Sequence, residues 1–344
     1  MKKNIIIIVI ASLFASIALF FGLRYYLDHK ASNFTETYVF FVYPDTSVEQ
    51  VKDSLVANAG VRRVGSLNRT FKELNLSETI KPGKYTVDPS TQAIYLARML
   101  AYGWQNSHKL TLSGTMRSKE RIAQKIDLQM MVDSATMMNA FNDSLLLAKY
   151  GMKPSMLFSY ILPDTYQMYW TTSAEDIIAR IQKEYNAYWT PERLAKAKAQ
   201  GLTKEEVSIL ASIVSGETLQ AFEYPIIAGV YLNRLRKGMK LQADPTIAYI
   251  FNYELDRVLR RHLLADSPYN TYKYVGLPPT PINVPPKDCI EAVLNPASHN
   301  YIYFCASSAF DGTHFFAATY SEHLKNARMF QRALTIRQRE AAQK

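Results

Sequence analysis

A single glutamate in the second half of the chain is a candidate acid. Glu217 follows Ile213 by four positions and Leu210 by seven, so a helix through this stretch places it on an apolar face. A carboxylate there is costly unless it is protonated or paired, and burial raises its pKa. Such a group suits general acid–base catalysis. The alternative is a helix that has already ended at Gly216, which would leave Glu217 as an exposed end residue.

Polar and aromatic residues downstream of Glu217 suit a carbohydrate ligand. Aromatic faces stack on sugar rings, while amides and hydroxyls bind the ring substituents. The candidate substrate-binding residues are Asn233, Gln242, Asp244, Tyr269, Asn270, Thr271 and Tyr272. Two alternatives remain open. The tyrosines of such loops often only pack at a rim, and Asp244 before Pro245 is typical of a helix N-cap.

Cap signals predict the helices that position these residues. The capping box from Thr203 to Glu206 opens the helix that carries Glu217. A second helix starts at Pro225 and ends at Gly238, the usual places for these two residue types. The elements expected after it are a helix from 244, a short helix near 286–294, and a hairpin of strands 301–306 and 314–318.

The first part of the chain predicts a small α+β module over residues 38–110. Its expected elements are a strand at 37–43, a helix from 47, a turn near 71–76, a strand at 83–87 and a helix after 90. A strand at 108–112 and a helix from 118 follow. The chain is then mostly helical to about residue 200, with a break at 162–166.

An apolar run from Ile5 to Leu23 predicts a membrane anchor. At ~1.5 Å per residue, these nineteen residues roughly cross a ~30 Å hydrocarbon core. A cleaved signal peptide is the alternative, but its apolar core is usually only about 7–15 residues long and ends in small residues. Lys2 and Lys3 are the expected cytoplasmic flank, which places the rest of the chain outside the cytoplasm.

The charge balance favours an anionic partner. Forty basic against thirty acidic residues give a net charge of +10, of which the flanking Lys2, Lys3 and Arg24 carry three. An extracytoplasmic location excludes nucleic acid as the natural partner and leaves an envelope polymer that bears carboxylates. The alternative is that this charge only keeps the domain soluble.

The cysteines and histidines predict neither a disulfide scaffold nor a metal site. The chain has two cysteines, which excludes a four-cysteine zinc cluster. We expect Cys305 to be a small core residue on a strand and Cys289 to be partly exposed at a helix start, without a required disulfide between them. His314 and His323 lack an accompanying ligand pattern, so no metal and no cofactor is expected.

Five ordered blocks of sequence resemble the YceG-like family of endolytic murein transglycosylases. Weaker similarity extends to residues 81–85 and 162–166. The five blocks are Leu210–Thr218, Ile227–Leu235, Gly238–Thr246, Ser267–Tyr272 with Gly276–Pro279, and Tyr303–Phe304 with Gly312–Phe315.

The resemblance implies an α+β protein in three parts. These are a single transmembrane helix over 1–24, a small LysM-like α+β subdomain over 25–110, and a mostly helical catalytic domain with a β-hairpin over 111–344. The implied location is the inner membrane, single-pass, with the catalytic domain in the periplasm.

The implied activity is that of a lytic transglycosylase, a carbon–oxygen lyase that cuts the β-1,4 bond between MurNAc and GlcNAc within peptidoglycan strands. The products carry 1,6-anhydro-MurNAc ends, and the cleavage is expected on nascent strands, ending their elongation. Glu217 matches the catalytic block and is the expected catalytic residue. The implied partners are glycan strands and, as candidates, peptidoglycan synthases (penicillin-binding proteins).

One departure from the family pattern keeps two alternatives open. The family's helix usually has two glutamates, and Ser215 stands at the first of these positions. One alternative is a hydrolase in which Asp244 or another acid activates water. The other is a wall-binding scaffold that has lost its activity together with the glutamate at position 215.

Overall fold

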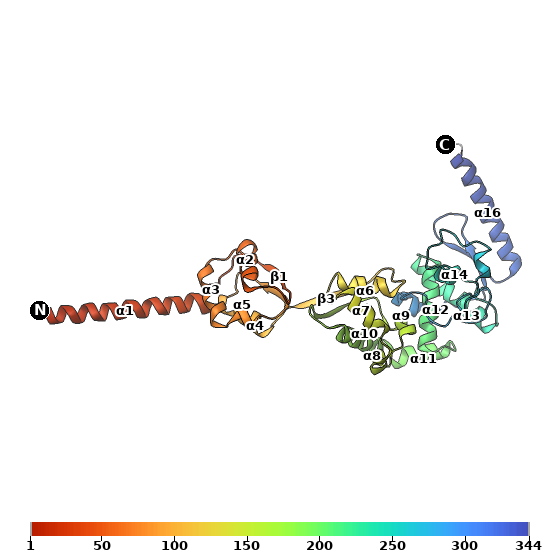
Figure 1. Ribbon diagram of the computed structural model, residues 1–344. Helices are drawn as coiled ribbons and strands as arrows, with labels where there is room; N and C mark the ends of the chain where they lie inside the picture. The colour runs from red at the N-terminus through yellow and green to blue at the C-terminus, as the bar shows by residue number, and fades with distance from the viewer. Residues whose placement is uncertain (1, 343–344) are drawn as a thin grey trace. The chain divides into compact units, whose positions relative to one another are not determined.

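The structure is a computed structural model that describes residues 2–342. The chain divides into two compact units (Figure 1). The first unit comprises the chain up to Leu110 with Asp127–Val132 and Tyr166–Thr172, and the second comprises Thr111–Ile126, Asp133–Thr165 and the described chain from Ser173 onward. The α+β prediction is confirmed, because the described chain is mostly helical with three small two-stranded sheets.

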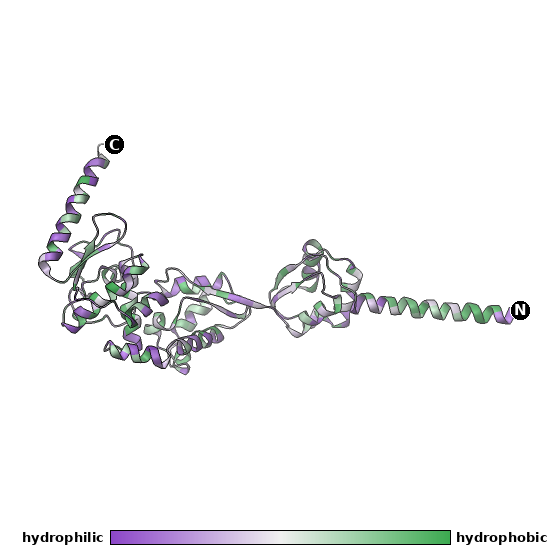
Figure 2. Cartoon of the chain, turned by 180° about the vertical axis from the view of Figure 1, so that it is seen from behind, coloured by the Kyte–Doolittle hydropathy of each residue, from purple (hydrophilic) through white to green (hydrophobic). Residues whose placement is uncertain are grey.

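The first unit begins with a long apolar helix, α1 (Lys2–His29). Among the described residues it is the one helix long and apolar enough to cross a membrane, and hydrophobic residues follow most of its length (Figure 2). Its last turn is anchored to helix α3 (Val64–Glu73). There the buried Asp28 accepts two hydrogen bonds from the Arg69 guanidinium, at 2.7 and 2.6 Å.

A two-stranded antiparallel sheet follows α1 in the sequence. Strand β1 (Tyr38–Val42) pairs with β2 (Gly83–Val87), with Phe40 opposite Tyr85 in the core. The helices of this module are α2 (Val48–Asn58), α3, α4 (Leu76–Thr79) and α5 (Ala93–Tyr102). The predicted strands and the helices from 47 and after 90 are confirmed. The turn expected near 71–76 is wrong at its start, since α3 runs to Glu73 and buries Leu67 and Phe71.

The middle of the chain is mostly helical, as predicted. Strands β3 (Ser107–Leu112) and β4 (Asp164–Tyr169) pair with each other, so the expected break at 162–166 is the start of a strand. The helices here are α6 (Lys119–Asp127), α7 (Ser134–Asn142), α8 (Ser144–Lys149), η1 (Pro154–Met156), α9 (Leu157–Tyr160), α10 (Ala174–Tyr188) and α11 (Pro191–Ala199).

The C-terminal part of the second unit is built around helix α12 (Lys204–Glu217). The predicted capping box is present, because Thr203 and Glu206 each bond the other's backbone N–H. Helix α12 packs against α13 (Tyr224–Arg236), α14 (Asp244–Ile250) and α15 (Lys287–Leu294). Every residue from Val207 to Val214 is buried, so the helix is enclosed on all sides. The other elements here are η2 (Ala221–Glu223), η3 (His262–Leu264), β5 (Tyr303–Ala306), β6 (His314–Ala317) and α16 (Tyr320–Ala342).

The expected hairpin is confirmed as the antiparallel pair β5 and β6. The cysteine prediction needs one correction. Cys289 is fully buried, because the first turns of α15 face the neighbouring helices α12 and α13, and Cys305 is the partly exposed one. Both are free cysteines.

Gly229 in the middle of α13 should not tolerate a side chain. An added Cβ would lie 2.9 Å from the Ala297 carbonyl oxygen and 2.7 Å from His299 Nε2. This loop cannot move away easily, since His299 Nε2 bonds the Ile226 carbonyl at 2.9 Å. We expect Gly229→Ala to lower the free energy of unfolding by about 1–3 kcal/mol, despite the roughly 1 kcal/mol gained in helix propensity.

Urea unfolding checks this expectation. Gly65→Ala in α3 is the matched control, because its Cβ would approach only the tip of the Arg69 side chain, at 3.1 Å. Equal stability of the two variants would contradict the close approach at Gly229.

Candidate active site

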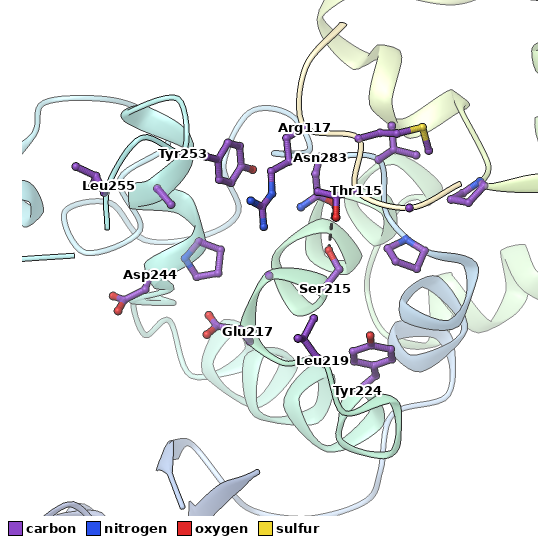
Figure 3. Close-up of a pocket in the computed structure, with 18 of the residues that line it drawn as sticks. Thr115, Arg117, Ser215, Glu217, Leu219, Tyr224, Asp244, Tyr253, Leu255 and Asn283 are labelled. Carbon is purple, nitrogen blue, oxygen red and sulfur yellow. Dashed lines mark hydrogen bonds between the residues drawn. The ribbon is translucent and has the colours of Figure 1, made fainter. Parts of the chain in front are cut away.

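A cavity of about 640 Å³ opens at the C-terminal end of α12 (Figure 3). Its walls come from the loop 114–117, Pro163, the end of α12, the start of α14 and the segments 253–258 and 283–286. Glu217 and Asp244 both line it, from α12 and α14 respectively. Segments far apart in sequence therefore bring two carboxyl groups to one hollow.

Glu217 is the last residue of α12, so the alternative of a helix that ends at Gly216 does not hold. Its Oε1 accepts a short hydrogen bond from the hydroxyl of Tyr231, which is fully buried on α13. Desolvation raises the pKa of the Glu217 carboxyl to about 7, and the charge of Asp244 adds to this effect. The Tyr231 hydrogen bond and the positive charge of Arg234 lower the pKa and oppose the rise only in part.

Arg234 is a buried cation that does not bond the Glu217 carboxyl. Its Nε donates to the Ile302 carbonyl at 2.6 Å and its Nη1 to the Leu241 carbonyl at 2.5 Å. The guanidinium is therefore held by backbone oxygens. It acts on Glu217 through its field, without forming an ion pair that would keep the carboxyl ionised.

Asp244 is exposed to solvent at the first position of α14, and its Oδ1 accepts a 2.5 Å hydrogen bond from the Tyr272 hydroxyl. The N-cap of this helix is Ala243, so the alternative of Asp244 as the cap is wrong by one residue. Helices α12 and α14 meet closely here. An added Cβ on Gly216 would lie 2.6 Å from Pro245 Cβ.

Ser215 lines the same cavity, two residues before Glu217 in α12. Its Oγ donates to Asn283 Oδ1 at 3.1 Å and to the Ser212 carbonyl at 2.9 Å. The Asn283 amide in turn donates to the same Ser212 carbonyl, at 2.9 Å. Figure 3 shows the bond between Ser215 and Asn283 in the cavity wall. Position 215 thus carries a hydroxyl within a hydrogen-bonded wall.

The other sequence-predicted site residues divide into two groups. Asp244 lies in the cavity and Tyr272 bonds it. Gln242 is exposed just before α14 with a left-handed backbone (φ 49°), and its N–H bonds the Thr271 carbonyl at 3.0 Å. Asn233 lies elsewhere, because its amide donates to the carbonyls of His299 and Tyr301 at 2.9 and 3.0 Å.

The loop from 263 to 273 is held together by its own polar residues. Asn270 is fully buried, and its amide donates to the carbonyls of Leu263 and Ala265 at 3.0 and 2.7 Å. Thr271 is buried as well and accepts the Ala243 N–H at 3.0 Å. Tyr269 bonds the Thr280 hydroxyl at 2.7 Å and lines a neighbouring cavity of about 500 Å³. Asn270 and Thr271 therefore shape the loop and do not face the Glu217 cavity.

Several residues of the site were not selected from the sequence. These residues are Arg117, Tyr231, Arg234, Tyr253 and Asn283, all of which line the cavity or interact with Glu217. One signal was available, because an arginine at position 234 follows Val230 and Tyr231 on the buried face of α13. The others come from segments that the sequence does not relate to α12.

The described residues 2–342 contain no group of three or more histidine, cysteine, aspartate or glutamate side chains that could hold a metal ion. His314 instead pairs with the buried Glu223, at 2.9 Å. His323 stacks on the Tyr303 ring, with the ring centroids 5.2 Å apart.

Comparisons with known proteins agree with this architecture. An endolytic murein transglycosylase of Bacillus subtilis is 34% identical over 213 residues, which cover 61% of this chain and 58% of the relative. One from Streptococcus pneumoniae is 25% identical over 343 residues, covering 89% of this chain and 61% of the relative. This chain therefore spans about three fifths of the length of these curated relatives.

A solved structure of a yceG-like protein from Listeria monocytogenes has 25% sequence identity and a TM-score of 0.57. The alignment covers 84% of this chain and 98% of that one. The YceG-like family itself matches residues 40–329, from strand β1 into helix α16. The resemblance inferred from the sequence is thereby confirmed, and the chain belongs to the YceG-like family.

Proposed function

We propose that this protein is an endolytic lytic transglycosylase that cuts the MurNAc–GlcNAc bond within peptidoglycan strands and leaves 1,6-anhydro-MurNAc ends. The observation that carries the proposal is the Glu217 carboxyl, which has a pKa of about 7 and lies in an open cavity. A carboxyl group with this pKa holds a proton to donate and is a useful base after donating it. The names of the relatives from two organisms support the same reaction.

The proposed reaction needs one group that acts twice. Protonated Glu217 gives its proton to the glycosidic oxygen as the bond to the MurNAc anomeric carbon breaks. The resulting carboxylate, which the Tyr231 hydroxyl stabilises, then takes the proton of the MurNAc 6-hydroxyl. That oxygen closes the 1,6-anhydro ring, and no water is consumed. An intramolecular nucleophile has a large effective concentration compared with water.

Asp244 supports a second candidate, a hydrolase. Its carboxylate is exposed in the same cavity, and a second carboxylate that activates water is the usual arrangement in inverting glycosidases. In the transglycosylase proposal, Asp244 instead raises the pKa of Glu217 and stabilises positive charge on the sugar. The product end distinguishes the two reactions. A catalytically impaired wall-binding scaffold is the third candidate, because Ser215 stands where the resemblance to the family leads us to expect a glutamate.

The proposed location is the inner membrane, with α1 as an uncleaved anchor and the rest of the chain in the periplasm. The helix continues to His29, and Asp28 in its last turn pairs with Arg69 of the module. Residues that follow are also part of the core, since Asn33 and Phe34 are fully buried. Signal-peptide cleavage near this point would remove a packed part of the fold, which supports retention.

We also propose the division into an anchor over 1–24, a LysM-like module over 25–110 and a catalytic domain over 111–344. The order β1, α2, α3, α4, β2 places helices between two antiparallel strands, which supports a LysM-like module that holds glycan. The proposed role is to terminate nascent strands, with glycan and peptidoglycan synthases as partners. The residues that remain proposed to support substrate binding are Asn233, Gln242, Tyr269, Asn270, Thr271 and Tyr272. Asn233, Asn270 and Thr271 would do so indirectly, because their side chains bond backbone groups of neighbouring loops and hold these loops in place.

Glu217→Gln should all but abolish glycan cleavage, because the amide keeps the shape but has no carboxyl proton to donate. A loss of roughly 10²–10⁴-fold is expected. Mass spectrometry of digested strands measures this loss and the wild-type product end together. Reducing ends from the wild type would identify a hydrolase, and near-normal cleavage by folded Glu217→Gln would exclude Glu217 as the acid.

The same variant should change stability in a pH-dependent way. The folded-state pKa of Glu217 is about 7 against an ordinary 4.5, so the folded protein holds this proton more tightly than the unfolded chain does. The stability from this proton is complete below pH 4.5 and is lost as the pH rises through 7. Glu217→Gln should therefore melt above the wild type at pH 8, with the advantage disappearing at pH 4. An advantage of equal size at both pH values would contradict the raised pKa.

Tyr231→Phe should shift the pH dependence of cleavage. Its hydroxyl lowers the pKa of Glu217, so its removal raises that pKa further. In wild type, kcat/KM should fall as the pH rises above about 7, and in the variant this decline should begin at higher pH. Tyr272→Phe is the comparison variant, because its hydroxyl bonds Asp244 and not the Glu217 carboxyl, so it should shift the profile less than Tyr231→Phe does. An unchanged pH profile in Tyr231→Phe would show that the Tyr231 hydroxyl does not set the pKa of the catalytic acid.

Amino-terminal sequencing of the membrane-extracted protein tests the anchor. We expect the chain to retain α1. A start near residues 25–35 would show cleavage and make α1 a signal sequence.

A further inference from the structure

The Glu217 cavity has two neighbouring cavities, of about 500 and 410 Å³. Arg117, from the loop after β3, lines all three of them. Figure 3 shows this side chain reaching into the Glu217 cavity between Tyr253 and Asn283. Arg117 therefore stands where a ligand bound at Glu217 would extend into the neighbouring space.

The cavities differ in charge. Glu217 and Asp244 are carboxyl groups of the first cavity, whereas no aspartate or glutamate in the described part of the chain lines the other two. Their charged lining residues are Arg117, Lys119 and Arg121. This arrangement favours a ligand that is neutral beside Glu217 and anionic beyond Arg117.

The Arg117 guanidinium is positioned but has no acidic partner. It lies over the Tyr253 ring, 4.4 Å from the centroid, and forms no ion pair with a carboxylate within residues 2–342. Lys119 is engaged differently, because its amine donates to Asn142 Oδ1 at 2.8 Å. A planar guanidinium held on an aromatic face still has donors for a carboxylate, which it binds in a two-pronged geometry.

Tyrosine rings form the wall next to Arg117. The Tyr249 ring lies 4.7 Å from that of Tyr269 and 6.1 Å from that of Tyr253, measured between centroids. The Tyr253 hydroxyl donates to the Ile282 carbonyl at 2.6 Å. This bond fixes the ring next to residues 283–284 of the cavity wall. The surface around the guanidinium is therefore preformed.

We propose that Arg117 and the two cavities beyond it bind the peptide stem of the MurNAc residue that Glu217 acts on, with Arg117 bonding a stem carboxylate. This inference rests on the proposed function. The GlcNAc and MurNAc rings of an intact strand carry no charge, and the stems carry its carboxylates. A neutral sugar beside Glu217 and an anionic stem beyond Arg117 match the charges of the cavities.

The test compares two substrates on the full-length chain in detergent. One is glycan strands with native stems, and the other is the same strands after carbodiimide coupling to methylamine, which turns stem carboxylates into neutral amides. We expect the wild type to prefer native strands by about tenfold in kcat/KM, the size of one charge-assisted contact. Arg117→Met should lose that factor on native strands and so show no preference between the two substrates.

Two further variants complete the design. Arg117→Lys keeps the charge and should retain part of the preference, and Arg332→Met, an exposed residue of α16, is the matched control with wild-type behaviour. Melting temperatures verify that each variant is folded. The inference is overturned if the wild type cleaves both substrates equally. It is also overturned if Arg117→Met slows both by the same factor, which would assign Arg117 to the sugar or to the fold. Failure of the wild type to cleave either substrate would instead contradict the proposed function itself.

Discussion

Placing the Glu217 carboxyl at the end of an enclosed helix costs free energy of desolvation, and the neighbouring groups reduce this cost without removing it. Tyr231 gives the carboxyl one hydrogen bond. Arg234 contributes a favourable field from a distance, since backbone carbonyls hold its guanidinium. A direct ion pair would keep the group ionised at neutral pH and unable to donate a proton. The chemistry of the site therefore depends on a desolvation cost that the neighbouring groups offset only in part, so that the pKa of Glu217 stays raised.

Two neighbouring segments approach helices α12 and α13 closely, and a glycine in each helix permits this. Gly216 lets Pro245 and the start of α14 come against the end of α12, which brings Asp244 into the cavity. Gly229 lets the loop at 297–299 lie directly on α13, two residues before Tyr231. A side chain at either position would have to displace a neighbouring segment. The position of Asp244 in the cavity thus depends on the close contact at Gly216.

Polar residues near the site serve two separate purposes. Asn270 and Thr271 are buried and hydrogen-bond to backbone groups, so they give the loop its shape. Tyr272 and Arg117 extend from such shaped segments toward the cavity or its neighbours. Rigid loops are what a site on loops requires, because the position of each outward-facing group is only as well defined as the backbone beneath it.

Sequence patterns alone predict the helix of Glu217, its capping box, the hairpin of β5 and β6, the apolar amino-terminal helix and the family. These features depend on local spacing, cap residues and ordered motifs, which can be read along the chain. The folding of distant segments against one another sets which polar residues face the cavity. Asn270 and Tyr272 are two positions apart in one motif, yet one is buried in the loop and the other bonds Asp244. It also decided the partners Tyr231, Asn283 and Arg117, because contacts between distant segments depend on how helices pack, and sequence spacing carries no record of that packing.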